Sequence, residues 1–108
     1  MSQTNAIILR IRAEDADEFE RAFREHEYPI WEDFKGRGRF LAASLTRVEY
    51  GTHQTEGIVN FLVMAKLTGH SAHSEHDNDP RFQAWDAQAE RFQVEEPLVF
   101  GGSTVFEI

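Results

Sequence analysis

Two neighbouring apolar segments constrain the fold of this chain more than any other feature. They span residues 40–50 (FLAASLTRVEY) and 57–67 (GIVNFLVMAKL), and a polar loop at 51–56 joins them. Both segments are predicted to be β-strands. Their apolar runs are nearly continuous in the middle, which is typical of a sheet covered on both faces. Because the rest of the chain offers only two helical regions, we expect a second copy of the chain to cover one face.

A strand and a helix are predicted before these two segments. Residues 6–12 (AIILRIR) place every second side chain on a fully apolar face, which indicates a strand. Asp15 is a suitable N-cap, and Glu18 would complete a capping box, so we expect a helix to begin there. Pro29 should kink this helix, or end it and let it restart. The apolar stripe of the helix is predicted to contain Phe19, Phe23, His26, Ile30 and Phe34.

The second half of the chain repeats this alternation. Residues 70–79 are predicted to be a polar, histidine-rich connection, and Asp79 is an N-cap followed by a proline at the first helical position. We expect this helix to end before Pro97 and residues 98–108 to form the last strand, with a bulge at 101–102. Its apolar stripe should hold Phe82, Trp85, Ala89 and Phe92. The order β-α-β-β-α-β is the ferredoxin-like pattern, an α+β fold with an antiparallel sheet.

The composition excludes several classes of partner. The chain is 41% hydrophobic and 28% charged, as in a folded protein, and we expect residues 1–108 to form a single domain. Its 11 Lys and Arg against 19 Asp and Glu leave a net charge of −8, which argues against nucleic acid and anionic membranes as partners. No signal peptide, membrane-spanning segment or cysteine is visible in the sequence. We therefore expect a cytoplasmic protein without disulfides or thiolate metal sites.

The histidines are the side chains whose ordinary pKa lies nearest neutrality. His70, His73 and His76 follow one another at intervals of three, ahead of Asp77 and Asp79. On a helical turn, two of these imidazoles could face one metal ion, whereas in a solvated loop they would only lie among carboxylates. We favour the loop and expect no metal, because zinc motifs of similar spacing need a further ligand or a glutamate base.

Several other polar and aromatic side chains are candidates for a site. His26 lies on the apolar stripe of the first helix, so it is either a hydrogen-bonded core histidine or a general base at the edge of a pocket. Arg10 and Asn60 lie among apolar neighbours within strands and must be hydrogen-bonded. Arg10 is expected to form an ion pair, and Asn60 either pairs across a subunit interface or binds a ligand. The large aromatic residues, which either pack in the core or line a pocket, are Trp31, Tyr50 and Trp85.

The segment 72–82 (AHSEHDNDPRF) resembles a segment of the antibiotic-biosynthesis monooxygenase family within the dimeric α/β-barrel superfamily. That family often has an alanine, a histidine four residues later and a phenylalanine six residues beyond it, and Ala72, His76 and Phe82 keep this register. Residues 95–100 (EEPLVF) are similar to the family's step into its last strand. The resemblance covers the whole order of elements. It implies a homodimer of ferredoxin-like protomers packed sheet to sheet, with a cavity between each sheet and its helices.

The same resemblance implies a monooxygenase- or cyclase-like enzyme that needs no cofactor and acts on an aromatic or polyketide-like molecule. A base would take a phenolic proton, and the electron-rich ring itself would reduce dioxygen, so neither metal nor flavin is required. We expect His76 or His26 to act as the base, and Asn60 or Arg10 to stabilise oxyanion charge. The residues expected to bind the substrate are Arg10, Trp31, Tyr50, His73 and Trp85.

Two other functions stay open at this point. The first is a non-catalytic dimeric protein that binds a small molecule or responds to stress, with a small or filled cavity. The second is a haem- or metal-binding protein that uses His73 or His76. A histidine-lined cavity would favour the enzyme, whereas a cavity filled by phenylalanine and tryptophan side chains would favour the binding protein.

Overall fold

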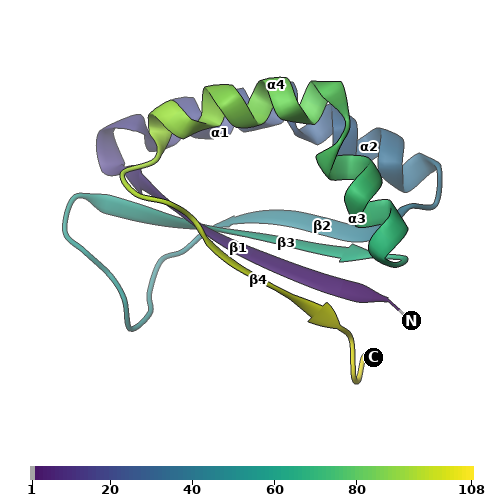
Figure 1. Cartoon of the computed structure of the whole chain (residues 1–108). Helices are drawn as coiled ribbons and strands as arrows, with labels where there is room; N and C mark the ends of the chain where they lie inside the picture. Colours follow the sequence, from purple (N-terminus) through teal and green to yellow (C-terminus); the bar gives the residue numbers. More distant parts are fainter. Residues whose placement is uncertain (1) are drawn as a thin grey trace.

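The computed structural model of the chain describes residues 2–108, which form a four-stranded antiparallel sheet with helices on one face (Figure 1). The strands lie in the order β2-β3-β1-β4. This confirms the predicted ferredoxin-like α+β fold, and the sheet of the single chain is open rather than closed into a barrel. The strands are β1 (Gln3–Arg12), β2 (Phe40–Arg47), β3 (Ile58–Leu67) and β4 (Leu98–Ser103), and the helices are α1 (Ala16–His26), α2 (Tyr28–Gly36), α3 (His70–Asp77) and α4 (Pro80–Ala89).

The central strand β1 divides its side chains between two environments. Leu9 and Ile11 point toward the helices and are buried, as the alternation of strand side chains predicts. Leu9 is opposite Phe61 of β3, and Arg10 is opposite Asn60. The residues between the buried ones, Arg10 included, therefore lie on the other face of the sheet, which we call the outer face.

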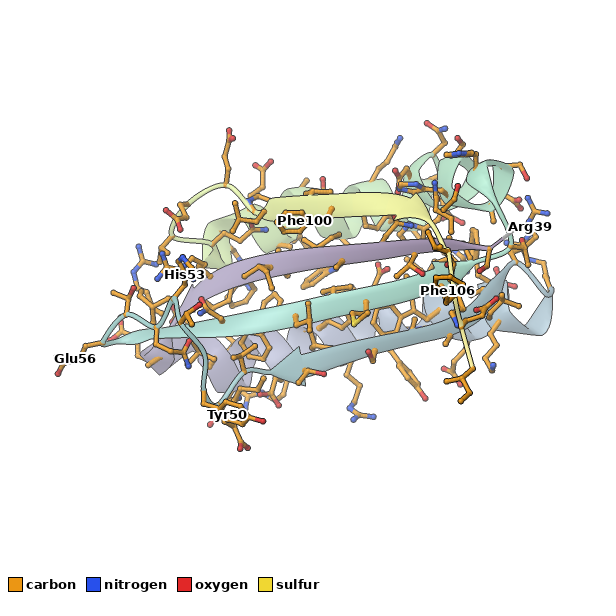
Figure 2. The ribbon with its side chains drawn as sticks, turned by 90° about the horizontal axis from the view of Figure 1, so that it is seen from below. Arg39, Tyr50, His53, Glu56, Phe100 and Phe106 are labelled. Carbon is orange, nitrogen blue, oxygen red and sulfur yellow. The ribbon has the colours of Figure 1, made fainter. Side chains whose placement is uncertain are left out.

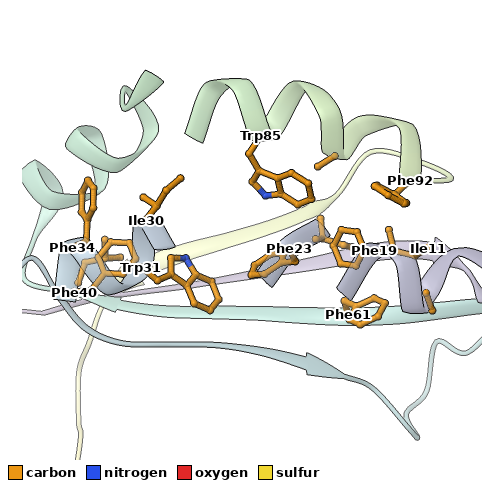
Figure 3. Packing of buried hydrophobic residues seen from close by; sticks show 14 of the residues in the cluster. Ile11, Phe19, Phe23, Ile30, Trp31, Phe34, Phe40, Phe61, Trp85 and Phe92 are labelled. Atoms are coloured by element: carbon orange, nitrogen blue, oxygen red, sulfur yellow. The ribbon is translucent and has the colours of Figure 1, made fainter. Parts of the chain in front are cut away.

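The core between helices and sheet is mostly aromatic (Figure 3). Phe19 of α1 lies at its centre, with ring centroids 4.9 Å from Phe61 and 5.5 Å from Phe92. Trp85 reaches the same layer from α4 and lies 6.0 Å from Phe23. Both predicted apolar stripes thus form the buried faces of the helices, except that His26 and Phe82 are only partly buried.

Pro29 ends one helix and helps to begin the next. Helix α1 stops at His26, and α2 starts at Tyr28 with the proline in its first turn, where a missing N–H costs nothing. Of the two predicted outcomes, restart rather than kinking is confirmed. The junction residue, Glu27, is buried, and this position becomes important for the site.

Two local predictions are wrong, the first only in part. Helix α1 begins directly after Asp15, its N-cap residue, as predicted, but Asp15 makes no side-chain capping bond and a 3₁₀ turn at Ala13–Asp15 precedes the helix. Residues 70–77 form a helix rather than the predicted polar loop, because Ala72 and His76 lie four residues apart and bury one face of α3. Burial of that face outweighs the polar character of the segment. The cap at Asp79 is confirmed, since its carboxylate accepts the Arg81 backbone N–H.

The predicted bulge at 101–102 is also wrong. The pairing of β1 with β4 runs without interruption through Gly101 and Gly102, and the irregularity of the sheet lies between Phe40 and Ala42 in β2. A Cβ atom on Gly101 would lie 2.4 Å from Asn5 Oδ1, the end of a side chain on the paired strand β1, so any larger residue here would require the Asn5 side chain to move.

The outer face carries apolar side chains that no helix among residues 2–108 covers. Figure 2 views the molecule from this side. Met64 is 40% exposed and Phe100 is 58% exposed, and the register places both opposite Ala6. The apolar members of this face are Ala6, Ile8, Leu62, Met64, Leu98 and Phe100. Across the part of the chain that the structure describes, no helix is long and apolar enough to cross a membrane.

Candidate functional site

A cavity of about 390 Å³ lies between the helices and the sheet. Its walls come from all four strands on one side, with β2 contributing Phe40, and from α1, α2, α3 and α4 on the other. Most of the walls are apolar, which suits a small organic ligand. The ionisable side chains that line it are Glu27, His73, His76, Asp77 and Asp86.

The helical side of the cavity contains a buried histidine–glutamate pair. His76 Nε2 lies 2.8 Å from Glu27 Oε1, and the two residues are 9% and 4% exposed. The other ring nitrogen, Nδ1, lies 3.2 Å from Asp77 Oδ1, which belongs to a half-exposed side chain. Because Glu27 accepts from Nε2, the imidazole is fixed in orientation.

The pair also sets the protonation of the imidazole. Burial of His76 opposes its positive charge, but the hydrogen bond and the charge of Glu27, helped by Asp77, more than offset this. The net effect raises the pKa of His76 above its ordinary value. His76 is therefore a stronger proton acceptor than a histidine in water.

Aromatic side chains surround the imidazole. Its ring centroid lies 4.3 Å from that of Phe82, 5.4 Å from that of Phe40 and 5.6 Å from that of Phe34. These contacts come from α4, β2 and α2, so three elements hold His76 in place. A ligand in the cavity would meet a histidine that is restrained by packing as well as by Glu27.

A second hollow, of about 650 Å³, lies between α1 and the edge strand β2. Its lining includes Arg47, which is held by ion pairs to Asp17 and Glu20. The lining side chains include no histidine. This hollow does not bring a base together with an apolar chamber, and we assign the site to the helix–sheet cavity.

Comparisons with known proteins concern the fold. No family model and no curated protein matches the sequence. A dimeric ferredoxin-like protein from an uncultured marine organism matches with a TM-score of 0.79 at 9% identity, over 99% of this chain and 90% of that chain. A candidate antibiotic biosynthesis monooxygenase from Nitrosomonas europaea gives 0.73 at 10% identity, over 97% and 91%. SnoaB, a cofactor-independent oxygenase from Streptomyces nogalater, gives 0.70 at 16% identity, over 99% and 96%.

The chain shares the ferredoxin-like fold of these proteins. This agrees with the resemblance in the segment 72–82. Of the residues that carried it, Ala72 and His76 are buried on one face of α3, and Phe82 in the first turn of α4 packs against the imidazole.

Four of the residues predicted for the site line the helix–sheet cavity. His73 and His76 line it from α3, Trp31 lines it from α2 and Trp85 from α4. The tryptophans belong to the core cluster as well, so their two predicted roles, packing and lining a pocket, coincide.

His26 lies beside the cavity without lining it. Its ring stacks on Trp85 at a centroid distance of 5.4 Å and an interplanar angle of 17°. The helix break after residue 26 turns Glu27 inward in its place. His26 thus contacts the cavity-lining Trp85 but does not itself line the cavity.

Arg10 and Asn60 lie on the outer face, across the sheet from the cavity. Arg10 Nε donates to Asn60 Oδ1 at 3.2 Å, and Arg10 Nη1 forms an ion pair with Glu95 at 2.8 Å. Asn60 Nδ2 in turn donates to the backbone carbonyl of His53 at 3.0 Å. The predicted ion pair of Arg10 is confirmed, but the oxyanion role is misplaced, because strand alternation points both side chains away from the helices.

Tyr50 is 87% exposed in the loop between β2 and β3, so it too lies apart from the cavity (Figure 2). Tyr50 was predicted to be the last residue of the strand at 40–50, but β2 ends at Arg47 and leaves Tyr50 in the loop.

The three histidines of α3 do not converge on one point, although His73 and His76 each contact an oxygen of Asp77. His70 Nδ1 lies 2.8 Å from Gln3 Nε2, and His73 Nε2 lies 3.0 Å from Asp77 Oδ2. Within residues 2–108, no group of three His, Cys, Asp or Glu side chains is arranged to hold a metal ion.

Glu27 is the site residue that sequence reasoning missed. It is not a member of the predicted apolar stripe of the first helix. Its spacing nevertheless carries a signal, because it follows Phe23 by four residues and precedes Ile30 by three. A carboxylate on the buried face of a helix destabilises the fold unless another group pairs with it, and here His76 is that partner.

Proposed function

We propose that this protein is a monooxygenase-like enzyme that acts, without a bound cofactor, on an aromatic small molecule in the helix–sheet cavity. The observation that carries the proposal is the buried His76–Glu27 pair in the wall of an apolar cavity. A base oriented by a carboxylate is a recurring arrangement for proton abstraction. The fold shared with a cofactor-independent oxygenase supports the same reaction class.

In the proposed reaction, His76 is the general base. With Nε2–H donated to Glu27, the neutral imidazole keeps its lone pair on Nδ1. In the structure, Nδ1 lies 3.2 Å from Asp77 Oδ1. For a substrate to reach Nδ1, the Asp77 side chain, which is 51% exposed, would turn toward solvent. A phenolic hydroxyl at this position would transfer its proton to Nδ1, and proton transfer of this kind contributes about 10²–10⁴-fold in rate.

The remaining steps use dioxygen as co-substrate. The deprotonated, electron-rich ring gives electrons to dioxygen, and one oxygen atom bonds to a ring carbon. For a ring CH₂ group, the balance is R₂CH₂ + O₂ → R₂C=O + H₂O. The carbon loses four electrons and two hydrogen atoms, dioxygen gains the four electrons, and the second oxygen atom leaves as water. Trp31 and Trp85 would stack against the ring and orient it.

We further propose that the protein is a homodimer joined through the outer face. Leu98 and Phe100 are each more than half exposed there, and an apolar surface of this kind favours association. The C-terminal residues leave the sheet on the same side and expose Val105 and Phe106 (Figure 1). A second copy would cover these groups and complete the barrel.

Oxygen uptake with a hydroxylated anthrone tests the enzymatic proposal. The natural chain should consume one dioxygen per substrate above the buffer rate, and His76→Gln should lower the rate about 100-fold. His53→Gln is the matched control, because His53 lies in the exposed loop. Binding of the anthrone without oxygen uptake would instead identify a non-catalytic binding protein.

A further inference from the structure

We infer that the helix–sheet cavity selects aromatic ligands that present a hydrogen-bond donor or a positive charge, and that it rejects aromatic carboxylates. The inference deepens the proposed function, since it names the ligand class of the same cavity. It rests on one unpartnered carboxylate oxygen and on the charges of the cavity wall.

The unpartnered atom belongs to Glu27. Oε1 of this carboxylate takes the contact with His76, but Oε2 is buried and has no hydrogen-bond partner among residues 2–108. A buried acceptor without a donor costs about 1–3 kcal/mol, and more when it carries charge. Glu27 also lines the cavity. A donor on a ligand in the cavity would satisfy this oxygen, whereas a second acceptor would leave it unpaired.

The charges of the wall point the same way. Three carboxylates line the cavity, and the lining side chains include no lysine or arginine. The groups that can become cationic, His73 and His76, are each already paired with a carboxylate. Arg10, the strand arginine nearest in sequence to the cavity-lining Leu9, points to the opposite face of the sheet.

Asp86 extends this acidic character to a more exposed part of the wall. Burial raises the pKa of Asp86, and the charges of Glu90 and Asp77 add to the effect. The smaller part of this effect, which comes from Glu90 and Asp77, reflects a negative potential at this part of the wall. An anionic ligand would lose its hydration and meet this potential without a cation to pair with, so the cavity disfavours it.

Three probes that share one ring system isolate this property: 2-naphthol, 2-naphthylmethylamine and 2-naphthoic acid. At neutral pH they present a neutral donor, a cation and an anion. Calorimetric titration of the full chain should show the naphthol and the amine binding at least 10-fold more tightly than the acid. The indole N–H signals of Trp31 and Trp85, the only tryptophans of the chain, should move in NMR spectra and locate the probes in the cavity.

Glu27→Gln should reduce the preference for the amine over the acid at least 5-fold. Glu25→Gln makes the same change of net charge on the exposed side of α1 and should leave the preference unchanged. If Glu27→Gln does not fold, Asp86→Asn takes its place and should reduce the preference at least 2-fold. Equal binding of acid and amine, a preference unaltered by the cavity variant, or no binding of any probe would each overturn the inference.

These probes need no turnover, so the result is separate from that of the oxygen-uptake experiment. Selective binding without oxygen uptake would leave the inference standing and remove the proposed enzyme. Oxygen uptake together with unselective binding would support the proposed enzyme and overturn the inference.

Discussion

His76 Nε2 lies 2.8 Å from Glu27 Oε1, and this single contact ties α3 to the junction between α1 and α2. The two residues are 49 positions apart in the chain. Their contact therefore depends on the packing of the helices over the sheet. The same contact holds the helices together and orients the proposed catalytic base.

Breaking the pair should destabilise the fold. His76→Leu leaves the Glu27 carboxylate buried without its cation, and removal of one partner of a buried pair costs about 3 kcal/mol. The double variant Glu27→Leu/His76→Leu removes both charges and should be more stable than His76→Leu alone. Urea unfolding of four proteins, namely the natural chain, Glu27→Leu, His76→Leu and the double variant, measures the difference. A double variant as unstable as the sum of its single changes would show that the pair contributes no coupling.

The stability of the fold should fall as the pH rises above neutrality. The pKa of His76 is raised in the folded state, so the protonated imidazole stabilises the fold fully below its unfolded pKa of about 6.5. That contribution is lost as the pH rises through the raised pKa. Chemical unfolding between pH 5 and pH 9, a range that begins below the ordinary histidine pKa of about 6.5 and extends well above it, should show the fall in the natural chain but not in His76→Gln. His53→Gln should keep it, and an NMR titration of His76 below its ordinary pKa would contradict the prediction.

Gly101 should tolerate a side chain less well than its neighbour. In Gly101→Ala the new Cβ would lie 2.4 Å from Asn5 Oδ1, and we expect a loss of about 1 kcal/mol. Gly102→Ala meets no atom within 4 Å and should be neutral or slightly stabilising. Asn5→Ala should recover most of the loss in a double variant. Thermal unfolding distinguishes these outcomes, and equal effects at both glycines would refute the close approach.

Charge on the outer face should dissociate the proposed dimer. Light scattering at micromolar concentration should give the natural chain twice its 12.5 kDa mass. Phe100→Glu places a carboxylate within the apolar face and should give the mass of one chain. Tyr28→Glu is the control, because Tyr28 is equally an exposed aromatic residue but lies on α2. A natural chain that scatters as a monomer would contradict the dimer.

The order of strands and helices could be predicted because each is encoded locally. Alternation in β1, the near-continuous apolar β3 and the Asp79 cap act over a few residues, and the structure agrees with each. The predictions that were wrong concern places where a distant neighbour decides. Residues 70–77 are helical because Ala72 and His76 are buried against other elements. Gly101 is explained by the side chain of a strand far away in sequence.

The candidate site was predictable only in part for the same reason. The spacing of three and four residues predicted that Trp85 faces the core, and the family resemblance indicated His76 as a site residue. Neither indicated Glu27, whose inward orientation follows from the end of one helix and the start of the next. Arg10 and Asn60 were expected at the cavity, and the pleat of the sheet turned them to the outer face.

By itself, the sequence determined the ferredoxin-like order of elements, the buried stripes and the acidic, cysteine-free character of the chain, since periodicity and composition need no knowledge of contacts. The tertiary structure alone decided that an imidazole and a carboxylate 49 residues apart meet inside the protein, and on which side of the sheet each polar group lies. The physical reason is that burial and electrostatic pairing act through space. A hydrogen bond of 2.8 Å is made or lost by the packing of whole helices, which no short window of residues encodes.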